Sequence, residues 1–120
     1  MRGFDYDDVL VAPRLSMGIN SKSDVDLSIK LKNLELGLPI IIAPMRGIVS
    51  PELIIEVSKL GGIGILHRFY DNHVDWANDI TEISHNTYNK NFGISVSLDW
   101  RKEQVLLDFA IEDGVKIICV

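Results

Sequence analysis

The sequence predicts an α/β protein in which about four parallel strands alternate with three helices. Four short segments are almost continuously apolar and rich in β-branched residues, which is typical of strands covered on both faces. The segments between them carry apolar residues at helical spacing, together with helix-capping residues. Elements that alternate in this way form a parallel sheet through right-handed crossovers. Such a sheet is either doubly wound or a closed barrel, and periodicity does not choose between the two.

The first strand and the first helix are predicted within residues 38–60. Residues 38–43, Leu-Pro-Ile-Ile-Ile-Ala, form a continuous apolar run. Ser50 then offers a side-chain oxygen as N-cap, and Pro51 suits the first position of the helix that follows. Gly61 is expected to end this helix. The buried stripe of the helix is predicted to consist of Leu53, Ile54, Val57 and Leu60.

The second strand, residues 62–66, overlaps the glycine-rich run Gly61-Gly62-Ile63-Gly64. A dinucleotide-binding fingerprint follows a strand and opens a helix, whereas this run precedes its strand. We therefore interpret these glycines as the end of one helix and as a place where that helix packs closely on the strand.

The rest of the chain repeats the pattern. A second helix is predicted around 74–83, with Ala77, Ile80 and Ile83 on its buried side, and a polar turn at 86–91 leads to a third strand at 92–97. Asp99 is expected to cap a third helix and Gly114 to end it. A fourth strand is predicted at 115–120. The buried side of the third helix is predicted to be Val105, Leu106, Phe109 and Ala110.

Composition narrows the classes of partner. The 120 residues are 47% hydrophobic and 24% charged, which fits one soluble globular domain. Seventeen acidic against twelve basic residues give a net charge of −5, and no Lys/Arg cluster provides a nucleic-acid footprint. No apolar run is long enough to span a bilayer and no signal-peptide pattern is found, so we expect no membrane partner and a cytoplasmic protein. The single cysteine, Cys119, cannot form an internal disulfide.

Two motifs near the N-terminus resemble a known family. Asp-Asp-Val-Leu-Val-Ala-Pro at 7–13 and Ser-Lys-Ser-Asp-Val-Asp-Leu at 21–27 resemble the Asp-Asp-Val-Leu-Leu-x-Pro and Ser-Arg-Ser-x-Val-Asp-Leu of the IMP dehydrogenase/GMP reductase family. Lys22 departs from the usual Arg, which keeps the positive charge but loses the planar fork that grips a phosphate. The resemblance implies the N-terminal half of a TIM (β/α)8 barrel within a single domain. Residues 1–37 would lead into the barrel, and residues 38–120 would form its first βα units.

Three further matches imply ligand-binding residues at the carboxyl ends of the predicted strands, where barrel enzymes place their sites. Ala43-Pro44-Met45 resembles the segment whose methionine lies against the substrate purine ring, so Ala43 and Met45 are expected to bind substrate. Arg68 and Ser97 lie in segments that resemble those beside the nicotinamide cofactor. Without the family, Met45 would be a core filler, Arg68 a strand-end residue bonded to a loop, and Ser97 a helix cap.

Ser21 and Lys22 align with a Ser-Arg pair that, in GMP reductases, reaches the cofactor of a neighbouring subunit. The resemblance therefore implies cofactor binding in a homo-oligomer, and otherwise these two residues belong to a solvated turn. We assign no metal, because the Asp residues at 5, 7 and 8 have no His or Cys partners. We also expect no catalytic residue here: the family's nucleophilic cysteine lies in a loop further downstream, and Cys119 is expected to be a small apolar strand residue.

The activity implied by the resemblance is that of GMP reductase, the NADPH-dependent reductive deamination of GMP to IMP. IMP dehydrogenases insert a pair of CBS modules after the second barrel unit, where this chain has only about two dozen residues, and Tyr70 and Asp75-Trp76 resemble the direct GMP reductase connection. One alternative is an IMP dehydrogenase without CBS modules, which converts IMP to XMP with NAD. Another is a non-catalytic fragment that needs a complementary C-terminal half, because half a barrel leaves an apolar face and two strand edges uncovered. The 120 residues alone are expected to be inactive.

Overall fold

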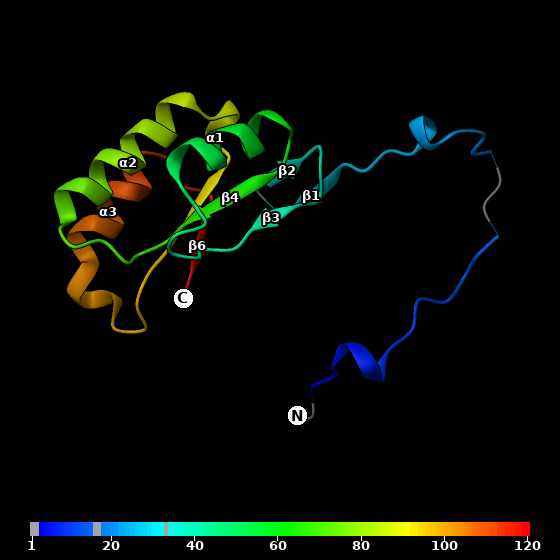
Figure 1. Cartoon of the computed structure of the whole chain (residues 1–120), viewed down its shortest axis with the longest axis horizontal. Helices are drawn as coiled ribbons and strands as arrows, with labels where there is room; N and C mark the ends of the chain where they lie inside the picture. Colours follow the sequence, from blue (N-terminus) through cyan, green and yellow to red (C-terminus); the bar gives the residue numbers. More distant parts are fainter. Residues whose placement is uncertain (1–2, 16–17, 33) are drawn as a thin grey trace.

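The computed structural model describes residues 3–15, 18–32 and 34–120. At its centre lies a parallel sheet with the strand order β3-β4-β5-β6 (Figure 1). The strands are β3 (Ile41–Ile42), β4 (Ile63–Leu66), β5 (Phe92–Ser95) and β6 (Ile117–Cys119). They are connected by the helices α1 (Pro51–Lys59), α2 (His73–Asn86) and α3 (Gln104–Glu112), which all cover the same face of the sheet. The predicted α/β fold, with four parallel strands alternating with three helices, is confirmed in the described residues.

The face under the helices, which we call the outer face, holds the larger core. Leu66, Phe92 and Ile94 point from the strands toward Ile54 of α1 and Ile80 of α2, and all five are fully buried. Burying a side chain of this size contributes about 1.5–3 kcal/mol. This core fixes the three helices on the sheet and therefore fixes the loops that follow each strand.

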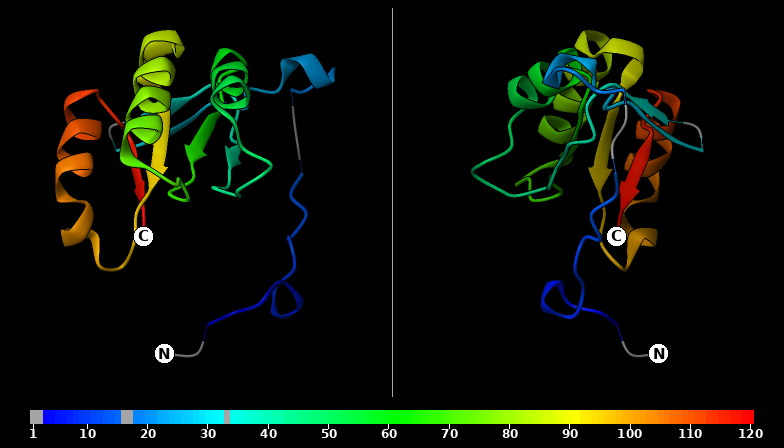
Figure 2. Two further views of the ribbon diagram at one scale, coloured as in Figure 1. Left: turned by 60° about the vertical axis from the view of Figure 1, so that its left-hand side comes forward. Right: turned by 90° about the vertical axis from the view of Figure 1, so that its right-hand side faces the viewer.

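The opposite face, which we call the inner face, is covered only near the amino ends of the strands. The cover is an antiparallel hairpin of β1 (Ile29–Leu31) and β2 (Leu34–Leu36), and Leu34 and Leu36 pack against Ile63. The hairpin was not predicted, although Ile-Lys-Leu and Leu-Glu-Leu show the alternation of a strand with one buried face. Residues 3–15 and 18–28 precede it as an arm that extends away from the sheet and contains η1 (Tyr6–Asp8) and η2 (Lys22–Asp24) (Figure 2).

The glycine-rich run has the structural role predicted for it. Gly61 follows α1 with φ +89°, a conformation that favours glycine, and its N–H donates to the carbonyl of Ser58. Gly62 and Gly64 face α1: a Cβ on Gly64 would lie 2.7 Å from Cγ1 of Ile54. The missing side chains thus allow α1 to lie directly on β4.

Several predicted boundaries need correction. The strand predicted at 38–43 is reduced to β3, because the Leu38 N–H bonds to the Gly61 carbonyl and the Ile40 N–H turns back to the Leu38 carbonyl. Pro39 has no N–H to offer the ladder. Asp99 makes no side-chain cap: η4 (Trp100–Glu103) precedes α3, and the Asp99 carboxylate pairs with Lys102 at 2.7 Å instead.

Two residues predicted to be buried are exposed. Leu60 is 72% exposed because α1 ends at Lys59, so Leu60 lies in the turn after the helix and not on its buried side. Val105 is 81% exposed because the 3-10 turn η4 shifts the phase of α3, so that Leu107 packs inward together with Leu106, Phe109 and Ala110. Of the predicted inward residues of α2, Ile80 and Ile83 are fully buried and Ala77 is partly buried.

The contact between α1 and β4 predicts the effect of Gly64→Ala. The added methyl group would meet Cγ1 of Ile54 at 2.7 Å and Cα of Ile54 at 3.1 Å, so the helix must shift. We expect the free energy of unfolding, measured by urea denaturation, to fall by about 1–3 kcal/mol. Gly3→Ala is the control, because no atom lies within 4 Å of its Cβ position. Equal stability of the two variants would contradict this account of the packing.

Candidate nucleotide site at the carboxyl ends of the strands

The carboxyl ends of all four strands border one open hollow of about 370 Å³. Parallel pairing brings these ends to one edge of the sheet, so residues far apart in the sequence become neighbours. We call this edge the rim. The hollow is lined by Pro44 after β3, Arg68 and Phe69 after β4, Ser95, Val96 and Leu98 at the end of β5, and Cys119 and Val120 at the end of β6.

Ala43 and Met45 lie at the rim directly after β3 and are both exposed. Met45 begins a tight turn: its carbonyl accepts from the N–H groups of Ile48 and Val49 at 3.1 and 3.0 Å. Its side chain is 53% exposed, so the structure does not support the interpretation of Met45 as a core filler. A thioether held at the rim in this way is free to contact a flat ligand.

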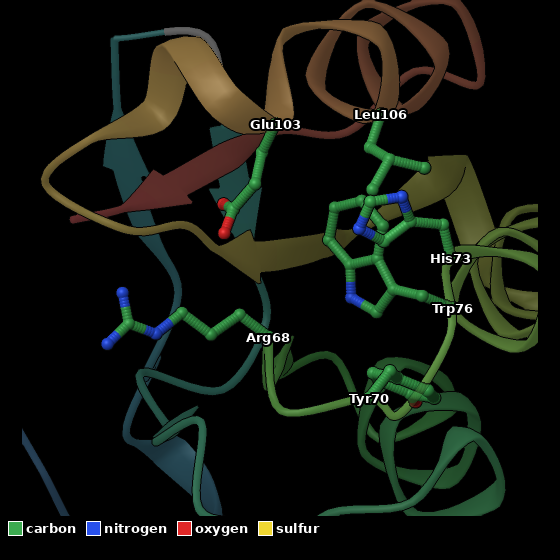
Figure 3. Close-up of a pocket in the computed structure, with 6 residues that line it drawn as sticks. All are labelled: Arg68, Tyr70, His73, Trp76, Glu103 and Leu106. Carbon is green, nitrogen blue, oxygen red and sulfur yellow. The ribbon is translucent and has the colours of Figure 1, made fainter.

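Arg68 lies at the rim after β4, where it borders two hollows. Its guanidinium carbon lies 5.0 Å from the centre of the Phe69 ring, and its side chain is exposed. In Figure 3 the Arg68 guanidinium points away from Trp76 and His73. The Glu103 side chain extends from η4 toward the side of the hollow on which Arg68 lies. The described residues give Arg68 no ion-pair partner, so its charge is available to an anionic ligand.

Ser97 is held at the end of β5 by a residue that the sequence did not single out. The Ser97 N–H donates to Oε2 of Glu103 at 3.1 Å, and its Oγ accepts from the Asp99 N–H at 3.3 Å. The hydroxyl therefore supports the loop before η4 and does not cap α3. Glu103 also borders the second hollow, so it connects the Ser97 loop to the surroundings of Arg68.

The second hollow, of about 140 Å³, lies between α2 and α3 beside the rim (Figure 3). It combines cationic, anionic and aromatic groups in a small space. It is lined by Arg68, Tyr70, His73, Trp76, Glu103 and Leu106. Arg68 belongs to both hollows and so marks the point where they meet.

Buried aromatic residues fix the loop after β4. The indole N–H of Trp76 donates to the carbonyl of His67 at 3.1 Å, and the Tyr70 hydroxyl donates to the Asp79 carboxylate. The rings of His67 and Tyr70 lie 4.9 Å apart. In the sequence Arg68 lies between His67 and Tyr70, which are both held by these hydrogen bonds. The backbone of Arg68 is therefore held in place although its side chain is exposed.

The same environment shifts two pKa values. Burial raises the pKa of Tyr70 above its ordinary value, and the hydrogen bond to the Asp79 carboxylate adds to the shift. Burial lowers the pKa of His67, the charge of Arg46 lowers it further, and the charge of Asp79 opposes both effects. His67 is 9% exposed and its Nδ1 has no hydrogen-bond partner among the described residues, which agrees with a neutral imidazole.

Ser21 and Lys22 are not brought to the rim. They lie on the arm at η2, which extends away from the sheet (Figures 1 and 2). Ser21 caps this turn in a reciprocal capping box with Asp24, and it also contacts the hydroxyl of Ser23 at 2.9 Å. Within one copy, then, these two residues and the four at the rim do not form one site.

Across the described ranges, no group of His, Cys, Asp or Glu is arranged to hold a metal ion. None of the helices in those ranges has the length and apolarity needed to cross a membrane.

Comparison with known proteins identifies the family of this fold and rim. Residues 3–107 match the model of the IMP dehydrogenase / GMP reductase domain. The chain belongs to this family. It is 38% identical over 68 residues to the inosine-5'-monophosphate dehydrogenase of Nitrosopumilus maritimus, a match that covers 56% of this chain and 14% of that protein. It is also 38% identical over 66 residues to the GMP reductase of Lactococcus lactis subsp. cremoris, which covers 55% of this chain and 20% of that protein.

Membership of the IMP dehydrogenase/GMP reductase family explains the architecture. The family is built on a TIM barrel, and four consecutive parallel strands with helices on the outer face correspond to part of such a barrel. The family consists of oxidoreductases that use nicotinamide cofactors. The matched segment spans a fifth or less of the length of these two relatives, and relatives with both names match equally well.

The lowered pKa of His67 predicts a pH-dependent stability. In the unfolded chain His67 takes up a proton near its ordinary pKa of 6.5, whereas the folded chain does so only at lower pH. The unfolded state thus binds more protons between these two values, so the free energy of unfolding decreases as the pH falls through this range. Chemical denaturation at pH 7.5 and at lower pH measures the decrease.

His67→Phe keeps a ring at this position and removes the titrating group, so its stability should fall less over the same pH range. His85→Gln, at an exposed position of α2, is the control and should behave like the parent chain. If His67→Phe and the parent lose stability in parallel, the buried imidazole is not the source of the effect.

Proposed function

We propose that this chain supplies the purine-side wall and part of the cofactor side of a GMP reductase-like site. The reaction would be the NADPH-dependent reductive deamination of GMP to IMP, with release of ammonia. The observation that carries this proposal is the rim, where Met45, Arg68 and Ser97 follow three adjacent parallel strands. Arg68 lines the hollow between the strand ends, together with Pro44 and Val96, the chain neighbours of Met45 and Ser97. Family membership adds the chemical class of the reaction.

Each rim residue has a role that suits its chemistry. Met45, with Ala43 beside it, would lie against the flat purine ring through its polarizable thioether. Arg68 would face the anionic part of the cofactor, since its guanidinium is exposed and unpaired in the described residues. Ser97, whose backbone is held by Glu103, would offer its hydroxyl to cofactor or substrate. Ser21 and Lys22 would reach the cofactor of a neighbouring subunit, since they belong to η2 on the arm, which extends away from their own sheet (Figure 2).

The connection from β4 to β5 favours GMP reductase over IMP dehydrogenase. It runs directly through α2, whose Trp76 and Ile80 are buried in the core, and it contains no inserted module. The second candidate is an IMP dehydrogenase without CBS modules that oxidises IMP with NAD; it is kept because the identity to the Nitrosopumilus dehydrogenase equals that to the Lactococcus reductase. Ligand preference separates the two candidates.

The covalent step of this chemistry needs a cysteine thiolate in a mobile loop. The only cysteine of this chain, Cys119, lies in a strand and is partly buried. We therefore propose that the 120 residues bind ligands without turnover. Residues 1–37 would lead into a single barrel domain whose first units are 38–120, in a cytoplasmic protein that acts as a homo-oligomer or with a complementary C-terminal half.

The proposal is tested by titrating the chain with GMP, IMP, NADPH and NAD in separate calorimetric experiments. GMP reductase-like function predicts that GMP and NADPH bind more tightly than IMP and NAD, and that a mixture of GMP and NADPH shows no loss of NADPH absorbance. Tighter binding of IMP and NAD would favour the dehydrogenase. Absence of binding by all four nucleotides would reject both functions for this chain and leave the non-catalytic fragment.

Arg68→Ala is expected to weaken NADPH binding. Loss of one charge-assisted contact costs about 1.5–3 kcal/mol, which corresponds to roughly a 10- to 150-fold higher Kd. Arg101→Ala is a matched control, because Arg101 is also exposed and its guanidinium carbon also stacks on the ring of a neighbouring residue, Trp100, at 5.5 Å. The assignment of Arg68 fails if both variants bind NADPH as the parent does, or if both lose the same affinity.

Met45→Ala is expected to weaken GMP binding and to leave NADPH binding unchanged. Removing the thioether contact with a purine ring costs on the order of 1 kcal/mol, or about a fivefold higher Kd for GMP. Ile48→Ala removes another exposed apolar side chain of the same turn and is the control. Unchanged GMP affinity in Met45→Ala would remove this residue from the substrate site.

A further inference from the structure

We propose that the edge of the sheet opposite the rim carries a second binding site, which takes a small organic cation with several N–H donors, of the guanidinium class. The site is an open hollow of about 330 Å³, which we call the amino-edge hollow. It is lined by Glu35, Gly37, Ser58, Gly61, Asn89 and Asn91. The proposed enzymatic function uses none of these residues, so the inference does not depend on that function.

Three parts of the chain meet at the amino-edge hollow. The hairpin contributes the end of β2, α1 contributes its last turn, and the segment from η3 (Tyr88–Lys90) into β5 contributes two asparagines. The helices run antiparallel to the strands, so α1 and α2 both end at this edge (Figure 2). The two hydrophobic cores hold the helices and the hairpin on the sheet, and the hollow therefore lies between fixed elements.

The hydroxyl of Ser58 is the first observation that points to a ligand. Ser58 lines the hollow and is only 3% exposed, and within the described residues its Oγ has no hydrogen-bond partner. A buried hydroxyl without a partner lowers stability and is rare in folded proteins. Ser84 on α2 is buried to the same extent, but its hydroxyl donates to the Asp113 carbonyl at 2.8 Å. A ligand in the hollow would give Ser58 the partner that Ser84 already has.

Asn91 is the second buried polar side chain of the hollow. It is 8% exposed, and its Nδ2 donates to the Glu35 carbonyl at 3.3 Å. This hydrogen bond connects the hairpin to the start of β5 and so fixes the side-chain amide. Because the bond uses the amide nitrogen, the amide oxygen is left as an acceptor for an N–H group of a ligand.

Glu35 gives the hollow a negative charge, and its lining contains no lysine or arginine. The ion pair between Glu35 and Lys30 spans 3.9 Å, and the two side chains are 72% and 78% exposed, so this pair is weak. Lys90, which follows Asn89, donates instead to the Asp113 carbonyl at 2.8 Å. The carboxylate of Glu35 is therefore available to a cationic ligand.

The helix ends at this edge add to the preference for a cation. The carbonyl groups of a last helical turn carry the partial negative charge of the helix dipole. Ser58 belongs to the last turn of α1, which ends at Lys59, and α2 ends at Asn86, shortly before Asn89. Both helices thus place the negative ends of their dipoles at the edge that holds the hollow.

A guanidinium group matches these acceptors. It is planar and permanently charged, and its N–H donors point in several directions, so it can bond a carboxylate, a hydroxyl and an amide oxygen at once. A metal ion fits less well, because Glu35 is the only carboxylate of the lining, and the described residues contain no cluster arranged to ligate a metal.

The site is tested by titrating the nitrogen-15-labelled chain with methylguanidinium while NMR follows the backbone amide of Gly61 and the side-chain amide of Asn91. We expect saturable shifts of both signals with a Kd on the order of 1 mM. This concentration lies far below the molar range in which guanidinium salts unfold proteins. Urea has the planar shape without the charge, and tetramethylammonium has the charge without N–H donors. Neither should give a saturable shift at the same concentrations.

Glu35→Gln tests the role of the charge. The amide keeps the shape of the side chain and loses the negative charge, so the Kd for methylguanidinium should rise about tenfold. Glu52→Gln makes the same change at the exposed opposite end of α1 and is the control. Its Kd should equal that of the parent chain.

Ser58→Ala separates a ligand-binding hydroxyl from a structural one. Without the probe, its urea midpoint should rise, because an unpartnered buried hydroxyl is removed. Its Kd for methylguanidinium should rise about fivefold, because one contact with the ligand is lost. Ser84→Ala is the matched control: it removes a hydroxyl that has a partner, so its urea midpoint should fall and its Kd should not change.

Absence of saturable shifts in the parent chain would overturn the proposal. Equal shifts with urea would also overturn it, because they would report general solvation of peptide groups. A Kd that neither Glu35→Gln nor Ser58→Ala changes would place methylguanidinium outside the amino-edge hollow and reject the site. None of these results bears on the proposed function, which is decided by nucleotide binding at the rim.

Discussion

The contact between α1 and β4 determines much of this structure. Gly62 and Gly64 have no side chain where α1 crosses the strand, so the helix lies against the backbone of β4. This close approach leaves β4 buried on both faces, between the helices outside and the β1–β2 hairpin inside. With β4 fixed, its carboxyl end carries His67 and Arg68 to the rim in one defined position.

The rim combines fixed backbone with exposed side chains, which is the arrangement expected of a binding site. The Trp76 indole holds the His67 carbonyl on one side of Arg68, and the Glu103 carboxylate holds the Ser97 N–H after the next strand. Neither partner lines the larger hollow between the strand ends, although both line the smaller hollow beside it. Packing of α2 and η4 thus positions groups that remain free to contact a ligand, which limits the entropy lost on binding.

The uneven cover of the two faces explains how this chain relates to its family. Helices bury the outer face, whereas the hairpin covers only the amino-terminal part of the inner face. In a complete barrel the inner face is covered because the sheet closes on itself. Here Ile41, on the inner face at the β3 edge, and Ile118, on the outer face at the β6 edge, remain partly in water. The described part of the barrel therefore leaves apolar side chains exposed at both edges of its sheet.

The sequence by itself determined the order and type of the βα elements. Apolar runs, the cap of α1 at Ser50 and the helix-ending Gly61 and Gly114 are local signals, and each depends on residues only a few positions apart. It also indicated the rim residues, through motif resemblance and the rule that sites follow parallel strands. Only the tertiary structure decided the hairpin's place on the inner face, the exposure of Leu60 and Val105, the role of Glu103 and the separation of Ser21 from the rim. These features depend on contacts between distant segments and on the exact phase of a helix, and periodicity in the sequence does not carry that information.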